Sequence, residues 1–278
     1  MHRLKYLTLL IMLSFHSCSM CSTKRTAPFS ADETVAAERP DDRAPWWSAS
    51  TVGYPRIGDS IQAVLLERYC YSVSYNTQAR QPNWVMWKLT SDHVRKRKEG
   101  IYNQFREDTS LPVNARAALT DYASSGFDKG HMCPGGDCNW DDMGRDETCL
   151  LSNICPQNPN LNRGDWKEIE LSCRSWAVQY DSIYIVCGPL FLKSQVHATI
   201  GTGRIPVPEA FFKVIVCPDA EHPRGIGFIC RNTDGNRKKD FYVNSIREVE
   251  RVTGYRFFPA LPDSVRSCVL DMDDIHLW

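Results

Sequence analysis

Apolar and polar residues alternate along this chain from about residue 63, in the manner of half-buried β-strands. Apolar side chains recur with a period of two over residues 65–75, which predicts one strand there. A polar turn over 76–81 separates it from residues 84–89, its expected hairpin partner. Further strands are predicted for 183–187, 211–217 and 226–231. A turn with proline and glycine joins the last two, so Cys217 and Cys230 could face each other across a hairpin.

Two segments have helical patterns. In residues 162–179, one helix face carries an apolar row, made by Trp166, Ile169, Cys173 and Trp176. Asn162 and Glu170 would lie about 80° apart around this helix, so both could face one cleft. Residues 244–253 form the second pattern, which ends at Gly254, a suitable left-handed cap. A short apolar strand is predicted for 150–155, directly before the first helix.

The beginning of the chain has the composition of a targeting segment. A basic start is followed by an apolar run over 7–15 that is too short to span a bilayer, which predicts a signal peptide over 1–21. Cys18 follows a stretch that loosely resembles a lipobox, and lipidation or simple secretion both stay open. Residues 22–60 are polar and rich in proline, as in a flexible linker, and one domain is predicted for 61–278.

Charge and cysteine content narrow the environment of the protein. The chain has 33 basic and 33 acidic residues, so attraction to a polyanion requires a local basic patch. Twelve cysteines in an exported chain predict an oxidising compartment and several disulfides of undetermined pairing. Zinc binding is an alternative for four of them, Cys133, Cys138, Cys149 and Cys155, although their spacing is not that of structural zinc sites.

The polar residues with catalytic potential lie between 128 and 170. His131 belongs to the sequence Asp-Lys-Gly-His-Met, and Asn153, Asn162 and Glu170 follow it. Phosphodiester cleavage needs an activated water and neutralisation of charge on the phosphate. A neutral imidazole suits the first task, and Mg²⁺ held by one asparagine oxygen, waters and the phosphate suits the second. The spacing therefore predicts a phosphodiesterase with a single divalent ion.

This segment resembles the DNA/RNA non-specific endonucleases of the ββα-metal superfamily, the endonuclease G-like group. Their motif reads Asp-Arg-Gly-His, then Asn-x-x-Pro-Gln, then Asn-x-x-x-Trp-x-x-Leu-Glu. The resemblance covers most of the chain from about Tyr69 onward. It implies an α+β fold, with a central antiparallel sheet and flanking helices. It also implies an Mg²⁺-dependent endonuclease that acts on DNA and RNA with little sequence preference, where Mn²⁺ or another divalent ion could replace Mg²⁺.

The resemblance also implies roles for individual residues. His131 would be the general base, Asn162 the metal ligand, and Asn153 a residue that orients the site. Glu170 would accept hydrogen bonds from waters around the metal, and Arg174 would contact phosphate. A second, upstream arginine stays unassigned between candidates such as Arg106 and Arg116.

Lys129 marks a departure, because the family has arginine at this position and lysine cannot make a bidentate phosphate contact. Lys129 is expected to take the catalytic and substrate-binding role of that arginine. The replacement could weaken activity or shift the substrate preference. Ordinary structural roles remain alternatives: Asn153 and Asn162 as turn or cap residues, and Trp166 and Trp176 as core. Two other functions stay open, an inactive lipoprotein that holds extracellular DNA and a hydrolase of small diesters. Export would place the protein in the periplasm, outside the cell or, through Cys18, on the outer membrane of a bacterium.

Overall fold

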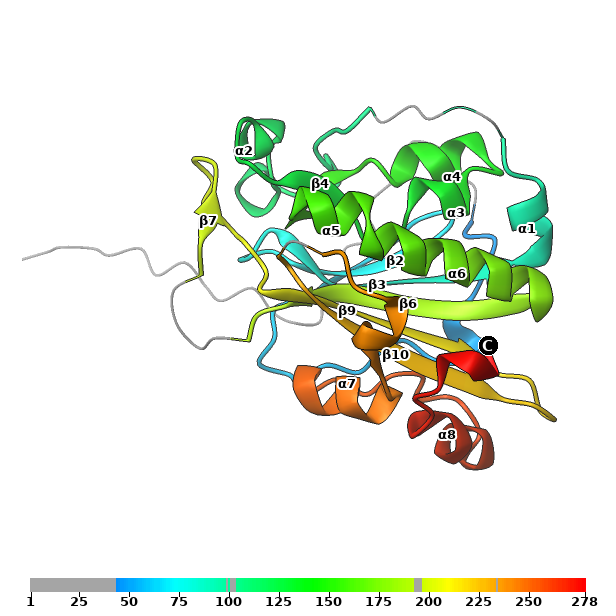
Figure 1. Cartoon of the computed structure of the whole chain (residues 1–278). Helices are drawn as coiled ribbons and strands as arrows, with labels where there is room; N and C mark the ends of the chain where they lie inside the picture. Colours follow the sequence, from blue (N-terminus) through cyan, green and yellow to red (C-terminus); the bar gives the residue numbers. More distant parts are fainter. Residues whose placement is uncertain (1–43, 99, 101–103, 193–196, 234) are drawn as a thin grey trace, which may run out of the picture. The chain divides into compact units, whose positions relative to one another are not determined.

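An antiparallel sheet is the main element of the computed structural model, which describes residues 44–98, 100, 104–192, 197–233 and 235–278 (Figure 1). Within these residues, seven strands form the sheet in the order β1-β2-β3-β6-β9-β10-β11. Their bounds are Val64–Glu67, Ser72–Asn76, Gln81–Thr90, Ser182–Leu190, Ala210–Cys217, Arg224–Arg231 and Val243–Asn244. This is the central antiparallel sheet that the resemblance implies.

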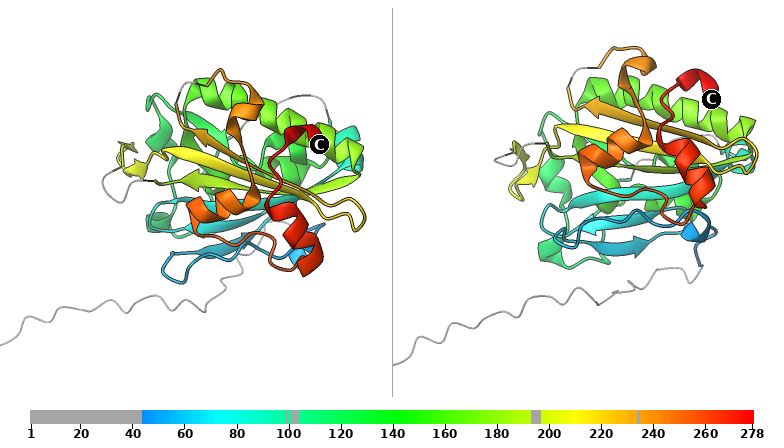
Figure 2. Two further views of the ribbon diagram at one scale, coloured as in Figure 1. Left: turned by 60° about the horizontal axis from the view of Figure 1, so that its bottom comes forward. Right: turned by 90° about the horizontal axis from the view of Figure 1, so that it is seen from below.

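Hydrophobic cores cover both faces of this sheet, because its central strands alternate apolar residues to either side. In β9, Phe211 belongs to one core and Phe212 to the other. Helix α6 (Asp165–Gln179) packs on the first face, while α7 (Ile246–Thr253) and α8 (Asp263–Leu270) pack on the second. Figure 2 shows α7 and α8 from below, in front of the strands.

The remaining elements form the region around the predicted site. Strands β4 (Asp128–His131) and β5 (Ile154–Gln157) pair antiparallel, and α5 (Pro159–Arg163) follows them. This succession is the ββα unit that the resemblance implies. The short elements are α1 (Ser91–Arg95), α2 (Leu119–Tyr122), α3 (Gly135–Cys138), α4 (Asp142–Glu147), β7 (Thr199–Ile200), β8 (Ile205–Pro206) and the 3₁₀ turn Leu151–Asn153.

Most predicted strands are confirmed, with two corrections. The single strand expected over 65–75 is two strands, β1 and β2, because the chain reverses between Arg68 and Tyr71, whose backbone groups hydrogen bond at 2.8 Å. The hairpin of β2 with β3 is confirmed. The strand expected over 150–155 begins with a 3₁₀ turn and becomes β5 only at Ile154. Local alternation indicates extended chain, but the reversals depend on neighbouring strands.

The helix predicted over 162–179 is wrong as one continuous helix. It is divided at Gly164, which has ψ −107° and so breaks the helical backbone. A Cβ atom there would lie 2.6 Å from the Asn160 carbonyl oxygen, so the break requires glycine. Asn162 lies inside α5, whose N-cap is Asn158, and it is not the helix start that the sequence suggested. The buried apolar face of α6 and the left-handed cap of α7 at Gly254 are confirmed.

The structure does not confirm the predictions for the cysteines. Cys217 pairs in register with Arg224 and Cys230 with Phe211, so the two cysteines lie at opposite ends of the hairpin and the predicted juxtaposition is wrong. The ten cysteines of the described residues are all free, where the sequence predicts several disulfides. Nine of them are buried, as small apolar side chains. Within the same residues no group of His, Cys, Asp or Glu has the geometry of a metal site, which removes the zinc alternative there.

The predicted linker is too long at its C-terminal end. Trp47, Ala49 and Val52 are buried in the core beneath α7 and α8, so the folded domain begins before residue 61. The signal peptide and residues 22–43 of the linker lie outside the described residues. None of the helices that are described is long and apolar enough to cross a membrane.

Candidate active site

His131 ends strand β4, at the edge of a cleft of about 490 Å³. Its Nε2 atom is buried and has no hydrogen-bond partner in the part of the chain that the structure describes. The Phe105 ring lies 5.1 Å from the imidazole, centroid to centroid. Burial lowers the pKa of His131 to about 4, since a charged imidazolium would lose its hydration. The side chain is therefore neutral at pH 7 and able to take a proton.

Gly130 allows this strand to lie against its partner. A Cβ atom at position 130 would be 2.3 Å from Oε1 and 2.6 Å from Cβ of Gln157, a residue that is itself fully buried in β5. Only glycine therefore fits between Lys129 and His131 without moving β5. The close approach explains the glycine of the Asp-Lys-Gly-His sequence by packing.

Asn153 fastens the chain that follows His131. Its side chain is fully buried and accepts a hydrogen bond from the Cys133 amide at 2.9 Å. The Nδ2 atom donates to the carbonyl oxygens of Cys133, at 2.8 Å, and Thr148, at 2.9 Å. Asn153 is not among the described residues that line the cleft, and its contacts hold the backbone of Cys133 and Thr148. Its orienting role stays a prediction.

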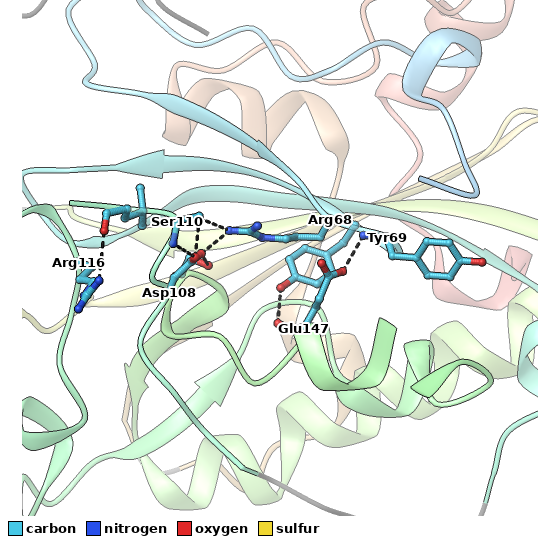
Figure 3. A network of polar contacts seen from close by, with 9 residues as sticks. Arg68, Tyr69, Asp108, Ser110, Arg116 and Glu147 are labelled. Atoms are coloured by element: carbon cyan, nitrogen blue, oxygen red, sulfur yellow. Dashed lines mark hydrogen bonds and ion pairs between the residues drawn. The ribbon is translucent and has the colours of Figure 1, made fainter. Parts of the chain in front are cut away.

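A buried ion pair holds the segment that carries Phe105 (Figure 3). Arg68, at the end of β1, pairs with Asp108 and donates to the Ser110 hydroxyl at 2.9 Å. Ser152, next to Asn153, donates to Asp108 at 2.5 Å. The Tyr69 amide donates to the Glu147 carboxylate at 2.7 Å and so anchors the end of α4. The turn between β1 and β2 thus holds the segment of Asp108 and the end of α4, which directly precedes the cleft residue Thr148.

Asn162 enters the cleft from α5. Its Nδ2 amide donates to Asp128 at 2.8 Å, so the orientation of the side chain is fixed and the carbonyl oxygen is left to act as a ligand. Arg163 also pairs with Asp128, with 2.6 Å between Nη2 and Oδ1. Asp128, the first residue of the motif, therefore couples β4 to two α5 residues that line the cleft.

Glu170 and Arg174 lie one turn apart on α6, on the cleft side. Nη2 of Arg174 is 3.7 Å from the Glu170 carboxylate, and its Nε donates to Asp137 at 2.7 Å. Burial raises the pKa of Glu170 to about 7, even though Lys213 and Arg174 act in the opposite direction. The carboxyl group can thus exchange a proton near neutral pH.

Cations dominate the described lining of the cleft. It contains five basic side chains and one carboxylate, Glu170. The basic residues are Arg97, Arg145, Arg163, Lys167 and Arg174. Burial and the neighbouring Arg174 both lower the pKa of Arg97, a sign that positive charges are crowded together. A chain with equal numbers of acids and bases thus carries the local basic patch that a polyanion requires.

The structure brings four of the predicted site residues into this cleft, His131, Asn162, Glu170 and Arg174. Lys129 is not among the described residues that line it, and its ammonium group lies 5.3 Å from the centre of the Phe105 ring. Of the arginines left unassigned, Arg106 pairs with Asp146 and Arg116 with Glu107, and neither lines the cleft.

Sequence reasoning missed Arg97 and Arg145. Both lie in charged segments near α1 and α4, and no periodicity distinguishes them from surface charges. Phe105 was missed as well, because an isolated aromatic residue in an irregular segment gives no pattern. Only the fold places these three beside His131 and Glu170.

The chain is similar to known nucleases over most of its length. A family model described as DNA/RNA non-specific endonuclease matches residues 48–264. Nuclease C1 of Cunninghamella echinulata var. echinulata is 35% identical over 210 residues, 70% of this chain and 83% of that protein. Mitochondrial Endonuclease G of Homo sapiens is 32% identical over 208 residues, 71% of this chain and 70% of that protein. A chain in the crystal structure of the EndoG/EndoGI complex has a TM-score of 0.67 at 30% identity, covering 71% of this chain and 86% of that chain.

Proposed function

Because this chain belongs to the DNA/RNA non-specific endonuclease family, we propose that it hydrolyses phosphodiester bonds in both DNA and RNA, with Mg²⁺ as its metal ion. The observation that carries the proposal is the cleft beside His131, whose described lining holds five basic side chains and one carboxylate. Two of these cations, Arg163 and Arg174, also pair with Asp128 and Asp137. Such a cleft attracts a polyanion through its phosphates and is indifferent to the bases. Little sequence preference follows from that mode of binding.

The donor atoms in the cleft fit a hard divalent cation. Asn162 offers an amide oxygen whose orientation is fixed by Asp128, and Glu170 offers a carboxylate nearby. The described residues hold no cluster of His, Cys, Asp and Glu that could enclose a metal ion. A site with one protein ligand suits Mg²⁺, which keeps several waters and binds substrate phosphate. When bound, the ion supplies electrostatic stabilisation of charge on the phosphate.

The side chains of the cleft divide the remaining work. His131, neutral because it is buried, takes the proton of the attacking water at its Nδ1 atom, since Nε2 is buried out of reach of water. Arg174 and Arg97 hold the non-bridging phosphate oxygens, and their charge favours the transition state. Glu170 accepts a hydrogen bond from water in the cleft and helps to order it. Products with 5′-phosphate and 3′-hydroxyl ends are expected.

The test is digestion of supercoiled plasmid and of RNA by the folded domain, with Mg²⁺, with Mn²⁺ and with EDTA. We expect nicking of both substrates that EDTA abolishes. His131→Ala should lose cleavage yet bind DNA, whereas His222→Ala, at an exposed histidine in the loop between β9 and β10, should cleave normally. Full activity of His131→Ala contradicts the role of His131. Salt-sensitive binding without cleavage by the wild-type domain favours an inactive DNA-binding protein.

The place of action is a separate part of the proposal. The basic start and the short apolar run support export, with residues 1–21 removed or Cys18 lipidated. Mass spectrometry of the chain recovered from a bacterial host distinguishes these outcomes, because a lipid adds its own mass to Cys18. An intact N-terminus in the cell pellet contradicts export.

A further inference from the structure

An exposed phenylalanine lies among cations in the segment between β10 and β11. The structure describes residues 232, 233 and 235–242 of this segment. Phe241 is 69% exposed. Arg237 and Lys238 precede it, are exposed as well, and form no ion pair within the described residues. A single exposed ring is ordinary on a protein surface, so its neighbours decide what it can bind.

The Arg237 guanidinium lies over the Phe241 ring, with 5.4 Å between Cζ and the ring centre. Most of the ring remains open to solvent and to a planar ligand. Proteins that bind single-stranded nucleic acid without sequence preference combine such rings with cations, because bases stack on the rings and the cations hold phosphates. The chemistry of Arg237, Lys238 and Phe241 therefore fits a nucleotide strand.

Asn232 fastens the start of this segment beside the cleft. Its Oδ1 atom accepts a hydrogen bond from the Asn158 amide at 2.7 Å, and its Nδ2 atom donates to the Pro156 carbonyl oxygen at 3.1 Å. Pro156 belongs to β5, and Asn158 is the N-cap of α5. The segment thus begins next to the helix that carries the cleft residues Asn162 and Arg163.

Helix α6 holds the rest of the segment (Figure 1). Asp165, its first residue, is 8% exposed and accepts hydrogen bonds from the Arg237 amide, at 3.1 Å, and from the Tyr242 hydroxyl. Lys239 donates to the Ser172 hydroxyl at 2.6 Å. These contacts involve backbone and inward side chains, so the side chains of Arg237, Lys238 and Phe241 stay available at the surface.

The cations of this segment continue those of the cleft. Arg163 and Lys167 line the cleft, and Asp165, which holds Arg237, lies between them in the chain. Among the described residues 163–168 and 235–241, the exposed charged side chains are four basic and two acidic. They are Arg163, Lys167, Arg237, Lys238, Glu168 and Asp240. The surface beside the cleft therefore keeps a net positive charge, complementary to phosphate.

We propose that Arg237, Lys238 and Phe241 form a second binding site for the nucleic acid strand that enters the cleft. Arg237 and Lys238 hold phosphates of the nucleotides just outside the cleft, and the Phe241 ring stacks on an unpaired base. The partner is a single-stranded polynucleotide, because a base in a duplex is already stacked and paired. The identity of this partner rests on the proposed function. The site contributes to binding and takes no part in the chemical step.

Binding of fluorescent oligonucleotides, measured by anisotropy in EDTA, tests the ring without cleavage. Single strands of about 4 and about 16 nucleotides are compared, as DNA and as RNA, because only the longer strand reaches from the cleft to the segment. Phe241→Ala should weaken binding of the longer strand about fivefold or more and leave the shorter strand unchanged. Phe241→Tyr keeps a stacking ring and should bind as the wild type does. Equal binding of the longer strand by the wild type and Phe241→Ala overturns the proposal.

Two further measurements separate the cations from the ring. The double variant Arg237→Ala/Lys238→Ala should lower the slope of log Kd against log salt by about 1.4 for the longer strand, as expected for two lost phosphate contacts. Arg247→Ala, on α7, is the control and should leave the slope unchanged. An unchanged slope in the double variant overturns the phosphate contacts. A duplex that loses as much affinity as the single strand in Phe241→Ala overturns stacking on an unpaired base.

Fold support and self-association are the competing explanations of the exposed ring. A lower melting temperature of Phe241→Ala means that the ring supports the fold, and it overturns the proposal. A wild-type dimer in sedimentation that Phe241→Ala dissociates means that the ring joins two copies, with the same consequence. Weaker binding of the longer strand by Phe241→Ala, in a domain that cuts no nucleic acid, keeps this site and removes the proposed function. Cleavage by the wild type with binding unaffected by Phe241→Ala keeps the function and removes the site.

Discussion

Glu170→Gln should make the domain more stable at alkaline pH while it removes activity. The substitution keeps the shape of the side chain and removes its charge. Burial raises the pKa of Glu170 to about 7 from 4.5, and its side chain is only 13% exposed, so little solvent screening is expected. Because the folded-state pKa is raised, the protonated form stabilises the fold below pH 4.5, and this contribution is lost as pH rises through 7.

The magnitude follows from that shift. At about 1.4 kcal/mol per pH unit, a raised pKa of this size corresponds to about 3 kcal/mol of unfolding free energy. The wild-type domain should lose this amount relative to Glu170→Gln between pH 4.5 and pH 8. His131, whose pKa is lowered, titrates in both proteins, so its effect cancels in the difference.

Urea denaturation followed by fluorescence, at several pH values in EDTA, measures the effect. Glu168→Gln, at an exposed glutamate of the same helix, is the matched control. Plasmid cleavage by Glu170→Gln should fall about 100-fold or more, as for loss of a group that supports the transition state. A stability difference that stays constant from pH 4.5 to 8 refutes the reasoning, because Glu170 would then not titrate with a raised pKa.

Three further predictions concern the frame of the cleft and its charge. Asn153→Leu removes three buried hydrogen bonds, so the free energy of unfolding, measured by urea denaturation, should fall by about 3 kcal/mol or more. A loss below about 1 kcal/mol contradicts the view that Asn153 fastens the backbone after His131. Gly130→Ala places Cβ 2.3 Å from Oε1 and 2.6 Å from Cβ of Gln157, so activity and melting temperature should both drop. Adding Gln157→Gly, which removes both atoms, should recover part of each, and no recovery means that the clash is not the cause. Arg97→Ala and Arg145→Ala should each weaken DNA binding and reduce the salt slope by about one, in titrations at several salt concentrations. Arg247→Ala is their control, because Arg247 lies on α7 and its exposed ion pair is with Asp271. Equal slopes in all three variants would contradict the proposed phosphate contacts.

Lys129 contacts an aromatic ring beside His131, which the sequence did not indicate. Its ammonium group lies over Phe105, the same ring that contacts His131, and Lys129 and His131 share one face of β4 because they are two residues apart. The lysine therefore adjoins His131, the proposed general base, through an aromatic neighbour. Its effect on substrate preference stays a prediction.

The sequence by itself determined the parts of this protein that depend on local periodicity and spacing. Alternation identified the hairpin of β2 and β3, and short apolar runs identified the strands β6, β9 and β10. The apolar row on α6 and the glycine cap of α7 were visible for the same reason, since neighbours in a helix or strand are close in sequence. The motif between 128 and 170 named three of the cleft residues, His131, Asn162 and Glu170, because they lie on adjacent elements, and Arg174 follows one turn later.

Tertiary structure decided what depends on contacts between distant segments. It divided the helix at Gly164, placed Arg97 and Arg145 in the cleft, and directed Arg106 and Arg116 to other carboxylates. The start of the domain also depended on contacts between distant segments, because Trp47 belongs to the same core as residues of the C-terminal helices α7 and α8. The charge states of site residues also depend on contacts between distant segments. A histidine or glutamate in a sequence has an ordinary pKa, and only the burial created by the whole fold makes His131 a neutral base and gives Glu170 a titration near pH 7.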